Sequence, residues 1–401
     1  MKPLKVLLIG SDPGLLQPIP SLLTRAGFTV DVISQTPLLR ATNQINNLWF
    51  ARDNEHLLEL VASHAPEPYD LIVLSEDVTI SLILKSSLPS KLKLKLLPVT
   101  AEKYYPHLFS KIGLSKALEA GNVLTPSFAI AQHLQELSPL ANSLGYPVMI
   151  KINASSGGIG VFICKSDRDI DHLLHTQEER LSSNLPLLIQ KKIEGITLDL
   201  SAFYQNGELI YFSHAAEEKT MYPLGPSCVR TYTQLGALDK SIYEELAGLG
   251  KALGAHGFSN ITAIWSCEDH RRYIIEADLR PNVWADYSRY IGNDTALAIQ
   301  DYFEHGTILQ FPQPINEQFP STLLVPLVSR LKFWEIVLNQ YDVWQFATRE
   351  QIVRRLIGRP VEKIRYAANR YAKPLIPAIL WLSLANGFAH IKIKLVRLLG
   401  R

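Results

Sequence analysis

The stretch KINASSGGIGV, from Lys151 to Val161, decides the fold prediction for this chain. The apolar runs YPVMIKI before it and GVFICKS after it have the length and composition of strands, so the sequence predicts a β-hairpin with a glycine-rich turn. Backbone N–H groups in such a turn can point at an anion because no Cβ blocks the approach, while Ser155, Ser156 and Lys151 add donors and positive charge. The loop by itself leaves two interpretations equally open: a polyphosphate clamp and a flexible hairpin tip.

Other glycine-based phosphate motifs do not fit the sequence. The pattern GxxxxGK[ST] is absent, and strands rather than a helix flank the loop. The segment GSDPG at 10–14 lacks the spacing of a dinucleotide fingerprint, so we interpret it as a turn between a first strand, KVLLIG, and a helix. A nicotinamide-dependent oxidoreductase is therefore only a distant alternative.

A second group of chemically active residues lies in YIIEADLRPN, residues 273–282. If this segment is a strand, Glu276, Asp278 and Arg280 share one face. The core-facing residues would then be Ile275, Ala277 and Leu279. Two carboxylates on one strand face suit Mg²⁺, and an arginine beside them suits a phosphoryl or carboxylate oxygen. The alternative, a solvated face with this charge pattern, is less favoured beside a phosphate-binding loop.

The order of predicted strands and helices in the rest of the chain indicates its domain organisation. Strand and helix patterns alternate through residues 1–100, which predicts a parallel sheet with helices on both faces. The further elements expected are helices at 111–121, 129–145, 167–181, 239–256 and 294–305, a strand in PLLIQKKIEG, a hairpin at 198–219 with an Asn206-Gly207 turn, and a hairpin at 259–281 with its turn near Asp269.

Together these motifs resemble the ATP-grasp superfamily of carboxylate–amine ligases, which includes D-alanine–D-alanine ligase, biotin carboxylase and the large chain of carbamoyl phosphate synthetase. The resemblance covers roughly residues 1–305 and implies a mixed α/β and α+β chain. The expected domains are a Rossmann-like parallel-sheet domain at 1–100, a small ATP-grasp lobe with the glycine loop at 101–187, a large lobe with the metal site at 188–310, and a basic helical extension at 311–401.

The resemblance assigns roles to individual residues through four motifs. SKIGLSKALEAGNVLTPSF places Lys111 on the ATP phosphates, and GYPVMIKINASSGGIGV places Lys151 on a phosphate and the adenine side. LLIQKKIEG is similar to the interdomain strand that lines the adenine pocket, and IIEADLRP is similar to the motif with the metal ligands. The implied nucleotide-binding residues are Lys111, Lys151, Ser155, Ser156, Gly157, Gly158, Gly160, Val161, Gln190, Lys191, Lys192, Ile193 and Asp199, the metal ligands Glu276 and Asp278, and the catalytic residues Arg280, Lys219 and Arg230.

This sequence departs from the family pattern in three places. The family has an acid or glutamine about thirteen residues before the metal-binding glutamate, whereas this neighbourhood reads NITAIW, with Asn260 and Thr262. Asp278 replaces the usual asparagine of the ExN motif. The ribose-binding acid has Thr197 at its aligned position and Asp199 as a nearby substitute. The number of metal ions and the capacity for turnover therefore stay open.

The resemblance implies an ATP- and Mg²⁺-dependent ligase, with Mn²⁺ as an alternative ion, that joins a small-molecule carboxylate to an amine or other nucleophile through an acylphosphate. Arg230 would hold a substrate carboxylate. The alternative is a nucleotide-binding regulator without turnover. We expect a homodimer and no nucleic-acid partner, since no recognition motif is present.

The cysteine content and the charge distribution indicate a cellular location for the chain. Three cysteines without CxxC spacing argue against a disulfide framework or zinc site and favour a reducing cytoplasm. Residues 353–401 contain eleven Lys/Arg and one acid, although the whole chain has a net charge of only +2. Residues 374–401 mix apolar and basic residues, and the apolar run from Pro374 to Ala385 within them is too short to span a bilayer. This segment could lie on the inner face of an anionic membrane; the alternative is a helical appendage that packs on the core or a second subunit.

Overall fold

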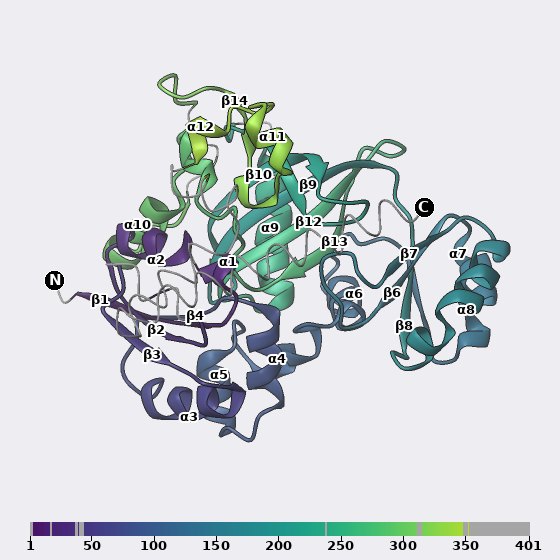
Figure 1. Ribbon diagram of the computed structural model, residues 1–401, viewed down its shortest axis with the longest axis horizontal. Coiled ribbons are helices and arrows are strands. Elements are labelled where there is room, and N and C mark those ends of the chain that lie inside the picture. The colour runs from purple at the N-terminus through teal and green to yellow at the C-terminus, as the bar shows by residue number, and fades with distance from the viewer. Residues whose placement is uncertain are drawn as a thin grey trace, which may run out of the picture. The chain divides into compact units, whose positions relative to one another are not determined.

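A computed structural model describes residues 3–16, 18–36, 39, 44–236, 239–309, 311, 315–347 and 352 (Figure 1). Of the predicted basic extension at 311–401, the part after Ile352, including the proposed membrane segment 374–401, lies outside the described residues. The chain divides into two units, one of Met1–Thr36 with Gln44–Val325 and one of Pro37–Asn43 with Pro326–Arg401. The first unit contains three sheets and all of the predicted site residues.

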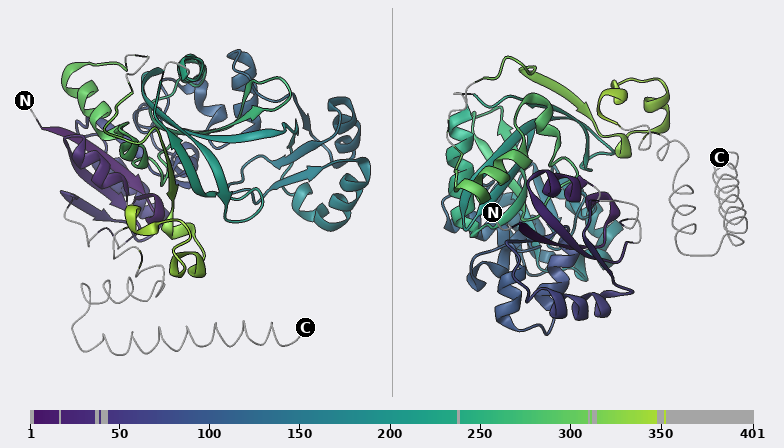
Figure 2. Two further views of the ribbon diagram at one scale, coloured as in Figure 1. Left: turned by 90° about the horizontal axis from the view of Figure 1, so that it is seen from above. Right: turned by 90° about the vertical axis from the view of Figure 1, so that its left-hand side faces the viewer.

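The N-terminal part of the first unit is a parallel α/β sheet, as predicted. Its strands follow the order β3-β2-β1-β4 and each pairs in parallel with its neighbour. The elements are β1 (Leu4–Gly10), α1 (Pro13–Leu16), α2 (Pro18–Arg25), β2 (Phe28–Ser34), β3 (Asn47–Phe50), α3 (Asn54–His64), β4 (Leu71–Leu74), α4 (Asp77–Lys85) and α5 (Ser90–Leu96). Figures 1 and 2 show helices on both faces of this sheet. The central run VLLI of β1 is fully buried, as a parallel strand covered on both faces requires.

A four-stranded antiparallel sheet carries the glycine loop. Its order is β5-β8-β6-β7, and every pair is antiparallel. The elements from here are η2 (Glu102–His107), α6 (Lys111–Ala120), β5 (Phe128–Ala131), η3 (Leu134–Glu136), α7 (Leu137–Leu144), β6 (Val148–Ile152), β7 (Val161–Cys164), α8 (Asp167–Ser182) and β8 (Leu187–Lys191). The predicted hairpin around the glycine loop is confirmed, and Figure 1 shows α7 and α8 beside this sheet.

One helix prediction in this region is wrong. The segment 129–145 was expected to be a single helix, but its first residues belong to β5 and pair with β8, with Phe128 opposite Gln190. The apolar run FAIA finds a sheet partner sixty residues away in the sequence, and the α-helix begins only at Leu137. Pairing with a distant strand outweighs local helix propensity here.

The third sheet has six strands in the order β13-β12-β9-β10-β11-β14. Its elements and the helices around it are β9 (Gly195–Gln205), β10 (Glu208–Thr220), β11 (Ser227–Thr233), α9 (Lys240–Leu253), β12 (Gly257–Ser266), β13 (Arg272–Asp278), η5 (Tyr287–Ile291), α10 (Thr295–His305) and β14 (Thr322–Pro326). Both predicted hairpins are confirmed, and the Asn206-Gly207 turn has the positive φ angles, 52° and 84°, of a tight hairpin turn.

The two faces of this sheet differ in character. Directly paired residues of β9, β12 and β13 share a face, and the row Leu200, Ile261 and Ala277 is buried in the core that also contains residues of α9. The rows Asp199, Thr262, Glu276 and Ser201, Asn260, Asp278 point to the opposite side. We call this second surface the polar face.

A β-bulge in β13 changes one of the predicted side-chain directions. Glu276 pairs with Thr262, but Ile274 rather than Ile275 pairs with Ala263, so Ile275 is the extra residue. Ile274 is buried while Ile275 is only half-buried, which makes the prediction for Ile275 wrong. The predictions that Ala277 and Leu279 face the core are confirmed.

The described part of the second unit contains η6 (Val328–Arg330), α11 (Phe333–Val337) and α12 (Val343–Phe346). Within the described ranges, none of the helices has the length and apolarity needed to cross a bilayer. The cysteines are free thiols, as predicted, with Cys164 and Cys228 buried and Cys267 exposed.

Candidate active site

The glycine loop is a tight connection whose backbone conformation needs glycine. Its base is closed by a 2.8 Å hydrogen bond from the N–H of Ile152 to the carbonyl of Gly160, and Lys151 lies opposite Val161. Gly157 and Gly158 have φ angles of +61° and +75°, in the left-handed region that favours glycine. A Cβ on Gly158 would also lie 2.0 Å from the Leu224 carbonyl oxygen. The loop is therefore shaped by contact with another segment as well as by its own turn.

That other segment is the connection between β10 and β11. The Tyr222 hydroxyl donates a 3.0 Å hydrogen bond to the carbonyl of Gly157, which ties this connection to the tip of the glycine loop. The connection is itself closed by hydrogen bonds from the Met221 N–H to Pro226 and from the Gly225 N–H to Tyr222. This contact was not predicted, because the two loops meet only through tertiary structure.

Lys151 is a buried cation with one defined partner. Its ammonium donates a 2.6 Å hydrogen bond to Oε1 of Gln190, and both side chains are buried. Burial lowers the pKa of Lys151 to about 8, against the opposing pull of Glu276, and Lys111 lowers it further. A lysine with a pKa of about 8 is mainly charged at neutral pH, and its charge is then available to an anion beside the glycine loop.

Lys111 approaches the same site from the first residue of α6. Its ammonium donates to the Ser155 carbonyl, and the Ile112 N–H and the Ser110 hydroxyl both donate to Oδ1 of Asn153. These bonds fix the start of α6 against the start of the glycine loop. Asn153 was not among the predicted site residues.

Glu276 lies between these lysines and a second carboxylate on the polar face. Burial raises the pKa of Glu276 to about 7 and Asp278 adds to the rise, while Lys111, Lys151 and Arg280 oppose it. Asp278 accepts hydrogen bonds at Oδ2 from Arg280 at 2.8 Å and from Asn260 at 3.3 Å. The predicted lysines, carboxylates and arginine therefore come together, although they lie up to 169 residues apart in the sequence.

Asp77, which the sequence reading missed, completes this cluster from the N-terminal sheet. It begins α4 just after β4, and its Oδ2 lies 2.7 Å from Nε of Arg280. Burial raises the pKa of Asp77 to about 6, Asp278 raises it further and Arg280 opposes the shift. A signal was available, because LIVLSED places acids at the carboxyl end of a parallel strand, where α/β sheets form their sites.

Arg280 is consequently held by two carboxylates. Its Nη2 reaches Asp278 at 2.8 Å and its Nε reaches Asp77 at 2.7 Å, and these acids raise its pKa above the usual value despite burial. This bidentate arrangement orients the guanidinium along the polar face.

A second ion pair is buried farther across the polar face. Nε of Arg230 lies 3.0 Å from Oδ2 of Asp199 and donates to the Ser227 hydroxyl at 2.8 Å. The guanidinium also lies 4.5 Å from the Trp284 ring centroid. Glu217 pairs with Arg230 across the strands, and burial and Asp199 raise its pKa to about 7. Arg230 and Asp199 are each less than a tenth exposed, and Oδ2 of Asp199 accepts no hydrogen bond from a described residue although it lies in the ion pair. The predicted substrate and ribose roles would therefore have to work from a buried ion pair.

The remaining predicted residues line the link between the lobes or lie beside it. Lys191 donates to the carbonyls of Gly145 and Tyr146, and Lys192 pairs with Glu194. The N–H groups of Lys191 and Lys192 are used within the fold, whereas no hydrogen bond among the described residues involves the Ile193 N–H. Lys219 is half-buried opposite Val229 on β11.

The donors on the polar face suit a magnesium ion. Within the described ranges there is no cluster of three or more His, Cys, Asp or Glu residues that could enclose a metal. Glu276 and Asp278 nevertheless point to the same side, and no described residue donates to Oδ1 of Asp278. Mg²⁺ is usually held by one or two carboxylates together with substrate phosphates and water, so this donor set fits it.

Comparisons with known proteins agree with the motif order. The model of the carbamoyl-phosphate synthase L chain ATP-binding domain matches residues 112–197. Biotin carboxylase 1 of Bacillus subtilis is 27% identical over 238 residues, covering 54% of this chain and 52% of the relative. The D-alanine–D-alanine ligase of Thermotoga maritima is 26% identical over 174 residues, covering 41% of this chain and 54% of the relative.

A solved structure shares the fold. The biotin carboxylase domain dimer of the 2-oxoglutarate carboxylase from Hydrogenobacter thermophilus, in complex with MgADP, ADP and bicarbonate, superposes with a TM-score of 0.59 at 15% identity, covering 78% of this chain and 72% of that one. The matched region spans about half the length of the two curated relatives above. The resemblance to ATP-grasp enzymes is thus confirmed, and the mixed α/β fold with one parallel and two antiparallel sheets agrees with it.

Proposed function

We propose that this chain binds ATP with Mg²⁺ and uses it to activate a small-molecule carboxylate as an acylphosphate, which an amine then attacks to form a C–N bond. The observation that carries the proposal is the convergence of two lysines, two carboxylates and an arginine beside the glycine loop. Lys151 lies at the base of the loop, Lys111 reaches the Ser155 carbonyl, and Arg280 pairs with Asp278 on the strand face that Glu276 shares. The other four charged groups all influence the pKa of Glu276, in agreement with this geometry.

Each group has a role that follows from its place. Lys151 and Lys111 would neutralise phosphate charge, since one is buried beside Gln190 and the other reaches the Ser155 carbonyl of the loop. The backbone N–H groups of the glycine loop would cover the phosphates. Arg280, oriented by Asp77 and Asp278, would offset charge on the phosphoryl group as it moves to the substrate carboxylate.

The remaining residues set the boundaries of the site. Glu276 and Asp278 would hold Mg²⁺, which when bound neutralises phosphate oxygens and orients them for transfer. Lys219 and Arg230 lie on β10 and β11, the strands that extend the six-stranded sheet beyond the carboxylates, where the acid and the amine would bind. Phosphoryl transfer of this kind needs no covalent nucleophile on the protein.

The proposed ligation consists of two balanced steps. A substrate carboxylate oxygen bonds to the γ-phosphorus of ATP while the bond to the bridging β–γ oxygen breaks and ADP leaves. The amine nitrogen then bonds to the acyl carbon, inorganic phosphate leaves with the carboxylate oxygen, and the nitrogen loses a proton.

A second candidate, a nucleotide-binding regulator without turnover, has one specific observation in its favour. Beside Glu276 and Asp278 the neighbouring strand β12 supplies Thr262 and Asn260 rather than an acid. A site with two carboxylates carries less negative charge than one with three and is less able to hold a second metal ion.

The experiment that separates the candidates measures ADP release from MgATP across a panel of carboxylic acids and amines. Lys151→Ala and Glu276→Ala should abolish acid-dependent ADP release, whereas Lys91→Ala, an exposed lysine on α5, should not. Trapping with hydroxylamine should yield a hydroxamate of the active acid. Unchanged activity in both site variants would refute the ligase assignment, and nucleotide binding without ADP release for any pair would favour the regulator.

A further inference from the structure

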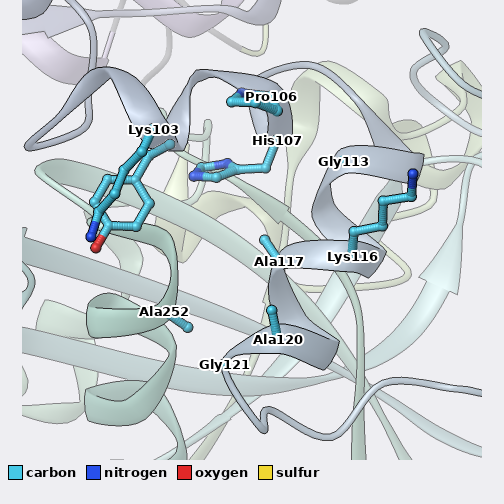
Figure 3. Close-up of a pocket in the computed structure, with 10 residues that line it drawn as sticks. Lys103, Pro106, His107, Gly113, Lys116, Ala117, Ala120, Gly121 and Ala252 are labelled. Carbon is cyan, nitrogen blue, oxygen red and sulfur yellow. The ribbon is translucent and has the colours of Figure 1, made fainter.

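A pocket of about 490 Å³ lies away from the polar face, between η2, α6 and α9 (Figure 3). Its lining residues are Lys103, Tyr104, Pro106, His107, Gly113, Lys116, Ala117, Ala120, Gly121 and Ala252. A volume of this size is in the range of small-molecule sites, roughly 300 to 1,000 Å³. Helix packing accounts for some of the small residues, since a Cβ on Gly113 would lie 1.9 Å from the Pro106 carbonyl oxygen. Packing does not account for the polar groups at the pocket.

His107 lines this pocket with a buried ring whose Nδ1 has no hydrogen-bond partner among the described residues and is closed to solvent. Its Nε2 lies 2.9 Å from the Leu253 carbonyl oxygen, and because a carbonyl only accepts, Nε2 must carry the hydrogen. In the neutral ring Nδ1 is then an acceptor, and no described residue donates to it although the side chain is only 5% exposed. Burial lowers the pKa of His107, which keeps the ring neutral at physiological pH. Figure 3 shows the ring reaching into the space between Lys103 and Ala117.

Two lysines and an aromatic ring complete the pocket. Lys103 and Lys116 are exposed and stand on opposite sides of the group in Figure 3, and neither forms an ion pair with another described residue. The Lys103 ammonium lies 4.9 Å from the Tyr104 ring centroid, and this ring meets that of His107 edge-on at 6.3 Å. The walls between the lysines are formed by alanines of α6 and α9.

We propose that this pocket binds a small amphipathic acid, one with an anionic group for Lys116 or Lys103 and a ring or short apolar body against the alanines, Tyr104 and the His107 ring. The pocket shares α6 with the candidate active site, because that helix begins at Lys111 and is anchored to Asn153 of the glycine loop. Binding of the acid should therefore change the affinity for nucleotide. This coupling rests on the proposed function, whereas the binding of the acid itself is independent of it.

The test uses the full chain and 4-hydroxyphenylacetate as the probe, with binding measured by saturation-transfer NMR and calorimetry. The compound 4-(2-hydroxyethyl)phenol lacks the carboxylate, so it should bind at least about fivefold more weakly, the loss expected for one hydrogen bond. Lys116→Glu and Ala117→Leu should weaken the probe by at least about fivefold through charge reversal and filled volume. The exposed Lys91→Glu on α5 and Ala62→Leu on α3 are matched controls that should bind it like the parent chain.

Absence of probe binding, or binding that survives both Lys116→Glu and Ala117→Leu, would overturn the proposal. Because Lys116 is exposed, its variant should fold even if Ala117→Leu does not. A second titration, with a non-hydrolysable ATP analogue and Mg²⁺, tests the coupling: a shifted Kd in the presence of saturating probe supports it, and an unchanged Kd refutes it. If the nucleotide does not bind at all while the probe does, the proposed function fails and the pocket stands.

Discussion

The two faces of the six-stranded sheet are built from the same strands and have opposite purposes. On one face Leu200, Ile261 and Ala277 are almost completely buried in the core that includes α9. On the other, the neighbouring residues Asp199, Thr262 and Glu276 form a polar row. Along β9, β12 and β13, residues that pack in the core therefore alternate with residues of the polar face. A shift of the strand register by one residue would exchange the two faces.

The difference has an energetic consequence. Burial of the apolar row stabilises the fold, at roughly 25 cal/mol for each Å² removed from water. The polar face instead keeps like charges close together, and the raised pKa values of Glu276 and Glu217, both about 7, show that their ionised forms are destabilised. Substitutions on the polar face should therefore cost function more than stability, and substitutions on the apolar face the reverse.

The largest expected effect is that of Glu276→Gln on acid-dependent ADP release. Loss of a carboxylate that would hold Mg²⁺ should reduce the rate about a thousandfold, or about 4 kcal/mol. The same variant should be more stable at pH 8: the folded pKa is about 7, so the folded state retains a proton that the unfolded state loses, and stability falls as pH rises from about 4.5 to 7. Removal of the charge should recover about 1 to 2 kcal/mol.

Chemical denaturation at pH 5 and pH 8 measures the second part of this prediction. The stabilisation should be present at pH 8 and small at pH 5, where Glu276 is already protonated. A variant that loses stability at pH 8 would show that the polar face supports the fold, which contradicts the contrast between the faces.

The buried pair Asp199–Arg230 should be an exception to the contrast between the faces, because it lies on the polar face but should contribute to stability. Asp199→Asn leaves the Arg230 guanidinium, only 5% exposed, without its counter-charge. Removal of one partner of such a pair costs about 3 to 5 kcal/mol. Denaturant titration should show this loss, with Asp301→Asn on the exposed side of α10 as the matched control. A decrease in the free energy of unfolding of less than about 1 kcal/mol would mean that the pair contributes no more than an exposed salt bridge.

An apolar substitution on α9 should give the reverse result to Glu276→Gln. Leu249→Ala removes a side chain that is 1% exposed and packs in the core beneath the sheet. We expect a loss of about 3 kcal/mol in the free energy of unfolding. The affinity for Mg²⁺ and a non-hydrolysable ATP analogue, measured by calorimetry below the melting transition, should stay within about threefold of the parent value.

The sequence was sufficient for the parts of the site that are local in the chain. The glycine hairpin, the Asn206-Gly207 turn and the alternation in β13 each depend on residues within a few positions of one another. For Asp77 the sequence shows only that an acid follows a parallel strand; its contact with Arg280, which makes it part of the site, joins residues 203 positions apart. The strand β5 and the bulge at Ile275 were missed for a related reason: both depend on which distant strand becomes the partner.

The pH dependence of nucleotide binding tests whether the charged groups of the polar face act on the nucleotide. Glu276 must lose its proton to accept a cation, so affinity for the Mg²⁺–nucleotide complex should rise as pH passes about 7. Lys151 loses its charge above about pH 8, so affinity should then fall. We expect a change of about tenfold for each pH unit at most on either limb. In Lys151→Arg the alkaline decline should disappear, because the arginine stays protonated; a decline that persists would assign it to another group.

The smallest expected effect concerns the contact between the two loops that cover the site. Tyr222→Phe removes the 3.0 Å hydrogen bond to the Gly157 carbonyl but keeps the ring. The bond is partly exposed, so its loss should weaken binding of the ATP analogue only about two- to threefold. Tyr290→Phe, on η5, is the matched control and should bind as the parent chain does. Because the Gly157 carbonyl belongs to the loop and Tyr222 to the six-stranded sheet's β10–β11 connection, an effect above about tenfold would mean that the sheet controls the loop through this contact. The polar face would then govern nucleotide binding through its connecting loop as well as through its charges.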